Sequence, residues 1–111
     1  MSISSITIAK ALDCLTVRQA YTAQNIANAN TPGYQALKVS FEESLRAAAG
    51  EGVGAVESLK PEVVPSGVAG DELRIDLELA TSSQTAMRYS SLIEVFGREM
   101  AISRAALVWG Q

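Results

Sequence analysis

Apolar residues recur at helical spacing near the beginning of the chain. From about residue 5 to residue 29, one line of positions advances alternately by four and three residues, as one face of an α-helix does. The line comprises Ile8, Leu12, Leu15, Gln19, Thr22 and Ile26. Because its later members include polar residues, we expect this end of the predicted helix to meet something other than a plain hydrophobic partner.

A longer line with the same spacing occupies the C-terminal third of the chain. It comprises Ile75, Leu79, Ser82, Ala86, Tyr89, Ile93, Phe96, Met100, Ser103 and Leu107, and none of these residues is charged. A repeat near 3.5 residues sustained over this length predicts a long helix that winds around a partner helix. Gly97 lies inside the predicted helix and would allow another backbone to approach closely.

The segment between these helices has a different composition. Residues 50–72 hold most of the eight glycines and two of the three prolines, so we expect a loop. The pieces 54–59 and 62–64 could pair as marginal strands, although Pro61 and Pro65 would deny them ladder donors. Residues 35–49 predict a short extended piece followed by a helical turn or two. The apolar residues of that turn are Phe41, Leu45 and Ala48.

The stretch NIANANTPGY, residues 25–34, predicts the end of the first helix and a sharp turn. Asn is poor inside helices but terminates them well, because it tolerates the left-handed conformation. Thr31 precedes a proline and is therefore driven toward an extended conformation. Pro32 and Gly33 suit the two central positions of a type II turn, after which Tyr34 begins a new direction.

The number of amides in this stretch allows two interpretations. A well-capped helix end would need one Asn and a Gly, whereas Asn25, Asn28, Asn30 and Gln24 spread hydrogen-bond donors and acceptors over several faces. Such amides suit lateral bonding between identical subunits without salt-sensitive charges. On the residues alone, plain capping explains the stretch equally well.

Composition argues against several classes of function. The chain has no histidine and one cysteine, Cys14, which excludes disulfide frameworks, Cys/His zinc sites and histidine-dependent catalysis. We expect Cys14 to be a small buried thiol. The net charge of −3 and nine scattered basic residues give no nucleic-acid footprint. We predict no catalytic, metal or cofactor site, no membrane span and no cleaved secretory signal.

Two stretches resemble a known family. RQAYTAQNIANANTPGYQA is similar to the N-terminal signature of the flagellar axial proteins of the basal-body rod and hook. DLELATSSQTAMRYSSLIEVFGREMAISRAAL resembles the C-terminal helix of proximal rod members of that family. The resemblance covers roughly residues 10–45 and 74–108. It implies an assembly motif made of Asn25, Asn28, Asn30, Thr31, Pro32, Gly33 and Tyr34.

The resemblance also implies a fold and a division of the chain. We expect a mainly α-helical fold whose long terminal helices pair as an antiparallel coiled coil, with a short, irregular Gly/Pro-rich middle segment. Residues 1–34 and 74–111 would form one domain, and residues 35–73 a variable linker. The expected helix-pairing seam is Ile8, Leu12, Leu15, Ile26, Ile75, Leu79, Tyr89, Ile93, Phe96, Met100 and Leu107.

The function implied by the resemblance is that of a structural subunit. Copies would assemble with other rod proteins into the hollow rod that crosses the bacterial periplasm, contacting basal adapter and membrane-ring proteins. The flagellar type III export apparatus would carry the subunit outward without signal cleavage. An export adapter or chaperone-like helical hairpin that binds one partner helix is the alternative. Trp109 would serve either an assembly contact or packing on its own helix.

Overall fold

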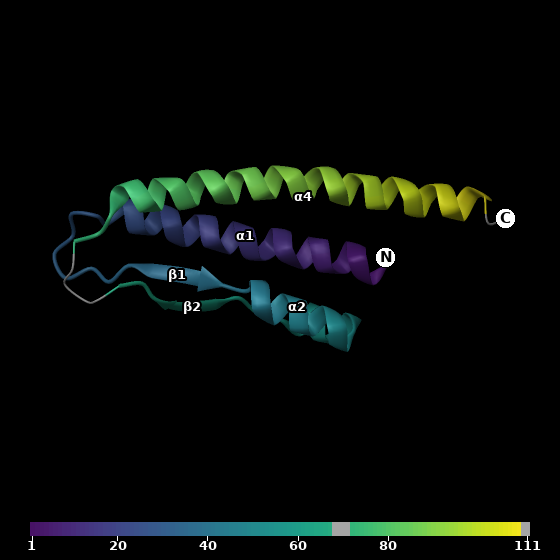
Figure 1. The fold of residues 1–111 in the computed structure, drawn as a ribbon, viewed down its shortest axis with the longest axis horizontal. Helices are drawn as coiled ribbons and strands as arrows, with labels where there is room; N and C mark the ends of the chain where they lie inside the picture. Colours follow the sequence, from purple (N-terminus) through teal and green to yellow (C-terminus); the bar gives the residue numbers. More distant parts are fainter. Residues whose placement is uncertain (68–71, 110–111) are drawn as a thin grey trace.

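The computed structural model describes residues 1–67 and 72–109, and the chain there forms an elongated, mostly helical structure (Figure 1). Its extents are 63 × 25 × 14 Å. The elements are α1 (Ile3–Ala27), β1 (Leu37–Ser40), α2 (Glu42–Glu51), α3 (Val53–Ser58), β2 (Glu62–Pro65) and α4 (Ile75–Trp109). The prediction of long N- and C-terminal helices is confirmed.

The two long helices lie side by side and run in opposite directions (Figure 1). Ser2 caps the start of α1, since its Oγ accepts a hydrogen bond from the backbone N–H of Ser5 at 3.1 Å. α4 continues well beyond this capped end. Its last turns therefore have no α1 residue beside them.

The middle segment is more ordered than the irregular linker we expected. β1 and β2 pair antiparallel, with Leu37 opposite Pro65 and Ser40 opposite Glu62. Of the two pieces considered above as marginal strands, 54–59 lies almost wholly in α3, whereas 62–64 does lie in a strand, β2, which pairs with β1 and not with 54–59. The expectation of a loop fails because Pro61 precedes β2 and Pro65 ends it, so neither proline interrupts the strand's interior.

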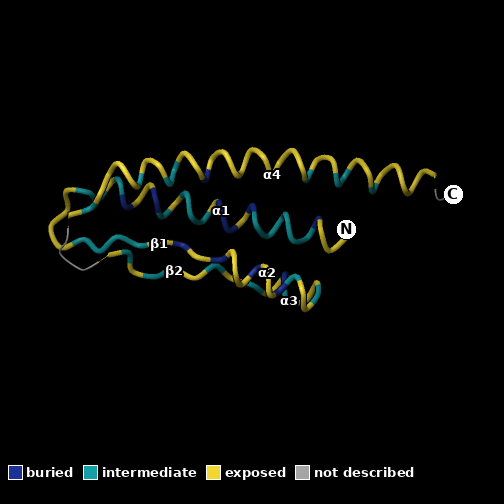
Figure 2. Tube along the Cα trace, viewed as in Figure 1, coloured by how far each residue is buried: buried dark blue, intermediate teal, exposed yellow. Residues whose placement is uncertain are grey.

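The hydrophobic core joins α1 to the middle segment. Its buried members are Cys14, Leu15, Val39, Phe41, Leu45, Ala48 and Val56. The turn predicted around Phe41, Leu45 and Ala48 is confirmed as α2 and the residue before it. Among the described residues, α4 adds only the partly buried Leu92 to this cluster. Figure 2 shows the contrast, with several buried positions along α1, whereas α4 is mostly exposed with intermediate positions at intervals.

Contacts between α1 and the first half of α4 are largely polar. Nε2 of Gln19 donates to the backbone oxygen of Ser82 at 3.1 Å. Thr22 and Thr85 are buried, and each hydroxyl donates to a carbonyl of its own helix four residues earlier. We predicted that this end of α1 meets something other than a plain hydrophobic partner. The prediction is confirmed, because within the chain it meets polar groups of α4.

Candidate assembly site

Asn25 is the centre of a hydrogen-bond network at the end of α1. The residue is buried, with only 1% of it exposed. Its Oδ1 accepts from the Tyr34 hydroxyl at 2.8 Å and from the Leu37 backbone N–H at 3.1 Å. Its Nδ2 donates to the Leu37 carbonyl at 2.7 Å and to Oε2 of Glu78 at 3.1 Å. The amide thus uses its full bonding capacity, two donors and two acceptors, to join α1, β1 and α4.

The other two asparagines of the motif have different surroundings. Nδ2 of Asn28 donates to the Gln24 carbonyl at 2.9 Å, and Oδ1 of Asn28 accepts from the Thr31 hydroxyl at 3.1 Å. Asn28 therefore closes the end of the helix, as the capping interpretation predicts. Asn30 is exposed. The motif contains one buried connector, one cap and one surface amide.

The predicted turn is present. The backbone N–H of Tyr34 donates to the Thr31 carbonyl at 3.2 Å, and Gly33 has φ +76°, as the third position of a type II turn requires. Thr31, Pro32 and Gly33 are exposed, whereas Tyr34 is partly buried through its bond to Asn25. The exposed part of the motif is available to another molecule, but its role in assembly stays a prediction.

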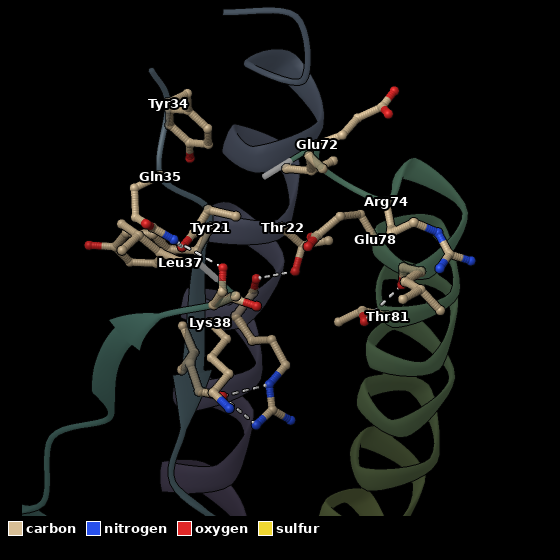
Figure 3. Close-up of a pocket in the computed structure, with 17 residues that line it drawn as sticks. Tyr21, Thr22, Tyr34, Gln35, Leu37, Lys38, Glu72, Arg74, Glu78 and Thr81 are labelled. Carbon is tan, nitrogen blue, oxygen red and sulfur yellow. Dashed lines mark hydrogen bonds between the residues drawn. The ribbon is translucent and has the colours of Figure 1, made fainter. Parts of the chain in front are cut away.

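Two hollows adjoin the turn. The larger has a volume of about 450 Å³ and lies between α1, residues 34–39 and the start of α4. Figure 3 shows Tyr34 and Gln35 on one side of it, with Glu72, Arg74 and Glu78 on the other. A second hollow of about 230 Å³ is lined by residues 28–34 with Glu72 and Leu73. In residues 1–67 and 72–109, no three His, Cys, Asp or Glu side chains gather to hold a metal ion.

An ion cluster that the sequence did not indicate holds three helices together. Nη1 and Nη2 of Arg18 bond the two carboxylate oxygens of Glu42, each at 2.7 Å. Arg18 also donates to the Val39 carbonyl, and its guanidinium lies 4.8 Å from the centroid of the Phe41 ring. Nη1 of Arg88 reaches Oε2 of Glu42 at 3.3 Å.

This cluster changes the ionisation of Glu42. The hydrogen bonds from Arg18 hold the pKa of the carboxyl at about 2, below its ordinary value of 4.5. Glu42 is therefore engaged in an ion cluster although its side chain is 44% exposed. Arg18 and Glu42 are 24 residues apart in the sequence, so no local spacing could have paired them.

The predicted helix-pairing seam divides between the two helices. Leu12 and Leu15 of α1 are buried, and Ile8 and Ile26 are partly buried. The α4 members that lie exposed are Ile75, Leu79, Tyr89, Ile93 and Leu107, while Phe96 and Met100 are partly buried. Within one chain, α4 meets the rest of the molecule through Glu78, Ser82, Thr85 and Leu92, of which only Ser82 belongs to the line predicted from spacing. A pairing role for the exposed members stays a prediction.

The two residues singled out for their chemistry occupy opposite environments. Cys14 is 1% exposed and belongs to the core, which confirms the expected buried thiol, and burial raises the pKa of this thiol. Trp109 is 88% exposed, so it does not pack on its own helix as one interpretation required. An exposed indole at this place is available for contact with another molecule.

Fold and site together define an elongated helical protein with a tightly bonded polar turn at one end and uncovered apolar side chains along α4. Residues 8–35 match the family model described as flagella basal body rod protein. The matched segment contains most of α1, the buried Asn25 and the whole turn. The match supports a structural role in the flagellar basal-body rod.

Other comparisons add less. No curated protein matches this chain significantly. Across the described ranges 1–67 and 72–109, no helix combines the length and the apolar content that crossing a bilayer would require.

Proposed function

We propose that this chain is a structural subunit of the bacterial flagellar basal-body rod, and specifically a proximal-rod subunit similar to FlgB. One observation carries the proposal: the family match at residues 8–35 contains both the buried Asn25 and the turn whose Tyr34 it bonds. A buried amide with four partners fixes the direction in which the chain leaves α1. The exposed turn is thereby presented in one defined position.

The proposed mechanism assigns different tasks to the two long helices. α1 is held by the core, while α4 offers apolar side chains to solvent, including Leu79 and Ile93, which are about half exposed. In an assembly these side chains would become buried, with α1 and α4 of neighbouring copies completing an antiparallel coiled coil. Copies repeated along an axis would build a hollow tube that lines the export channel and transmits torque.

The proposal also specifies place and partners. The tube would be the rod that spans the periplasm, reached through the flagellar type III export apparatus without a cleaved signal. Its partners would be further copies, other rod proteins, and basal adapter and membrane-ring proteins. No enzymatic activity, cofactor, nucleic acid or membrane insertion forms part of the proposal.

Gly33→Val tests the proposal in a flagellated host whose own copy of the gene is deleted. The φ of +76° at Gly33 is strained for any residue with a Cβ and most of all for a β-branched one. We expect the wild-type gene to restore swimming in soft agar and Gly33→Val to fail, at equal protein levels. Full motility with Gly33→Val would contradict the proposed role of the turn.

Electron microscopy of purified basal bodies separates the subunit from the alternative export adapter or chaperone-like hairpin. A rod subunit labelled with a small epitope is present in the finished rod. An adapter that binds a partner helix transiently is absent from it. Absence of the label from rods that otherwise assemble would therefore overturn the proposal.

A further inference from the structure

The two-stranded sheet has two long edges, and side chains of α1 cover the edge that belongs to β1. Nδ2 of Asn25 donates to the Leu37 carbonyl, and Oδ1 of Asn25 accepts from the Leu37 backbone N–H. Arg18 donates to the Val39 carbonyl through Nε at 3.2 Å and through Nη2 at 2.7 Å. These backbone groups of β1 therefore point toward α1 and away from β2.

The edge that belongs to β2 lies on the opposite side of the sheet. Figure 1 shows β1 between α1 and β2, and within residues 1–67 and 72–109 β2 packs chiefly against β1. Val63 is 37% exposed, and Glu62 and Pro65 are exposed as well. An uncovered strand edge is a template on which an extended segment of another chain can pair.

The register of the sheet identifies the residues of β2 whose backbone groups face this open edge. Along an antiparallel strand, the backbone groups of successive residues point alternately toward and away from the partner strand. Leu37 points its groups toward α1, so Pro65, which lies opposite it, faces the open edge. Val39 points its carbonyl toward α1, so Val63 faces the open edge for the same reason. Two residues earlier, Pro61 is the next on that side.

Two of these three outward-facing residues are prolines, which have no backbone N–H. Of the three, only Val63 has both a donor and an acceptor on the open edge. We propose that Pro61 and Pro65 close the outer edge of β2 to pairing with the same strand of a second copy. The inference goes beyond the proposed function and does not depend on it, because it concerns the sheet of the middle segment.

The pairing that the prolines prevent would be antiparallel and centred on Val63. Val63 of one copy would bond Val63 of the other through its N–H and its carbonyl. On either side, Pro61 of one copy would lie opposite Pro65 of the other, and neither residue could donate a hydrogen bond. The strands would keep the bonds of one residue and lose those of its outward-facing neighbours, which leaves the pair without a continuous ladder.

Charge alone would not prevent this pairing. In the arrangement centred on Val63, Glu62 of one copy lies opposite Val64 of the other, so like charges do not meet directly. Val63 and Val64 are β-branched residues, which favour strands. The protection of this edge is therefore assigned to the two prolines.

Replacing both prolines in the whole chain tests the inference. Pro61→Thr combined with Pro65→Thr restores both missing donors on the open edge with a residue type that favours strands. Glu62→Thr combined with Val64→Thr is the matched control. It places two threonines in the same strand at residues whose N–H groups point toward β1. Circular dichroism checks that both proteins fold.

Sedimentation velocity over a range of concentrations measures the association. We expect the proline double variant to associate roughly tenfold more strongly than the wild-type chain, or more, because each restored donor completes a hydrogen bond between the copies. The control should behave as the wild-type chain does, and each single proline variant should lie between the wild type and the double variant. Equal association of the proline double variant and the control would overturn the inference.

Amide exchange followed by NMR locates the contact on β2. In a dilute wild-type sample, the Val63 N–H should exchange much faster than those of Glu62 and Val64, which point toward β1. In the proline double variant, protection of the Val63 N–H should rise with protein concentration. Stronger association without this protection would place the contact elsewhere and contradict the inference.

The wild-type measurement also decides the matter by itself if the variants fail to fold. Protection of the Val63 N–H equal to that of Glu62 and Val64 in a dilute sample would show that the edge is already covered. The prolines would then have no open edge to close, and the inference would be wrong.

Discussion

Arg18 of α1 and Glu42 of α2 form a bidentate ion pair whose two N–O distances are both 2.7 Å. Arg18 is held on its other side by the Val39 carbonyl, and its side chain is only 14% exposed. Arg88 of α4 contacts the same carboxylate. One glutamate therefore links α1, the middle segment and α4, which makes it sensitive to substitution and to acid.

Glu42→Gln should lower the free energy of unfolding at neutral pH by about 1 kcal/mol. The lowered pKa alone would suggest about 3 kcal/mol, but the side chain is 44% exposed and solvent screening reduces the effect. Because the folded pKa lies below the ordinary value, the carboxylate stabilises the fold fully above about pH 4.5. This stabilisation is lost as the pH falls toward 2.

Urea unfolding of both proteins between pH 7 and pH 2 measures this difference. The difference should shrink with acidification and be largely lost by pH 2. Glu43→Gln is the control, because the Glu43 side chain is 87% exposed and its pair with Arg46 should contribute little. A difference between Glu42→Gln and wild type that is independent of pH would contradict the assignment.

Asn25→Ala should destabilise the chain by about 2–4 kcal/mol. The substitution leaves the backbone N–H and carbonyl of Leu37 and the hydroxyl of Tyr34, which are partly buried, without their partner. Asn30→Ala is the matched control, since Asn30 is exposed and its replacement should change stability by no more than ~0.5 kcal/mol. Thermal unfolding followed by circular dichroism compares the two. Equal effects would show that Asn25 is not the connector described above.

Gly33→Val should cost about 1–3 kcal/mol in the isolated chain, whereas Gly33→Asn should cost clearly less. A Cβ at Gly33 would meet nothing within 4 Å, so the penalty comes from the backbone conformation at φ +76° and not from collision. Asn tolerates the left-handed region better than a β-branched residue does. Chemical unfolding of both variants provides the comparison, and equal losses would point to a steric cause.

Gly97→Ala should stabilise the isolated chain by about 0.5–1 kcal/mol. Gly97 lies inside α4, and a Cβ built there has no neighbour within 4 Å. Alanine therefore gains helix propensity without a clash. Calorimetry measures the change in the midpoint of unfolding. A loss of stability would mean that another part of the chain approaches Gly97.

Backbone amides of α4 near Trp109 should exchange with solvent much faster than those of α1 near Leu15. The α1 amides lie in the part of the chain that packs the core, whereas the last turns of α4 bury little apolar surface. Hydrogen exchange followed by mass spectrometry resolves the two helices. Equal protection in a monomeric sample would contradict this ranking.

The sequence predicted the elements whose signals are local. The helical spacing predicted where α1 and α4 begin and end to within about two residues. Pro32 and Gly33 identified the turn through their own conformational limits, and residues 35–49 were correctly predicted as an extended piece followed by helix. Each of these inferences used residues that are close together along the chain.

The features that escaped prediction depend on distant partners. Residues 62–64 were considered as a marginal strand, but β2 pairs with β1 across the whole of α2 and α3 and not with residues 54–59. The Glu42 cluster joins residues from three helices. Only part of the α4 line chosen for its apolar residues meets α1 in one chain: Ser82 bonds Gln19, whereas Leu79 and Tyr89 are exposed. Spacing gives the period of a helix but not which of two adjacent lines a partner will cover.

The hydrophobic core is formed almost entirely by residues outside α4, which contributes only Leu92 among the described residues. Detaching that helix from α1 would break several polar bonds but would empty very little of the core. In the proposed rod, adjacent copies in a curved wall would therefore be free to hold α4 at slightly different inclinations while the remainder of each copy keeps its shape. Variation in geometry along such a wall would be confined to one helix.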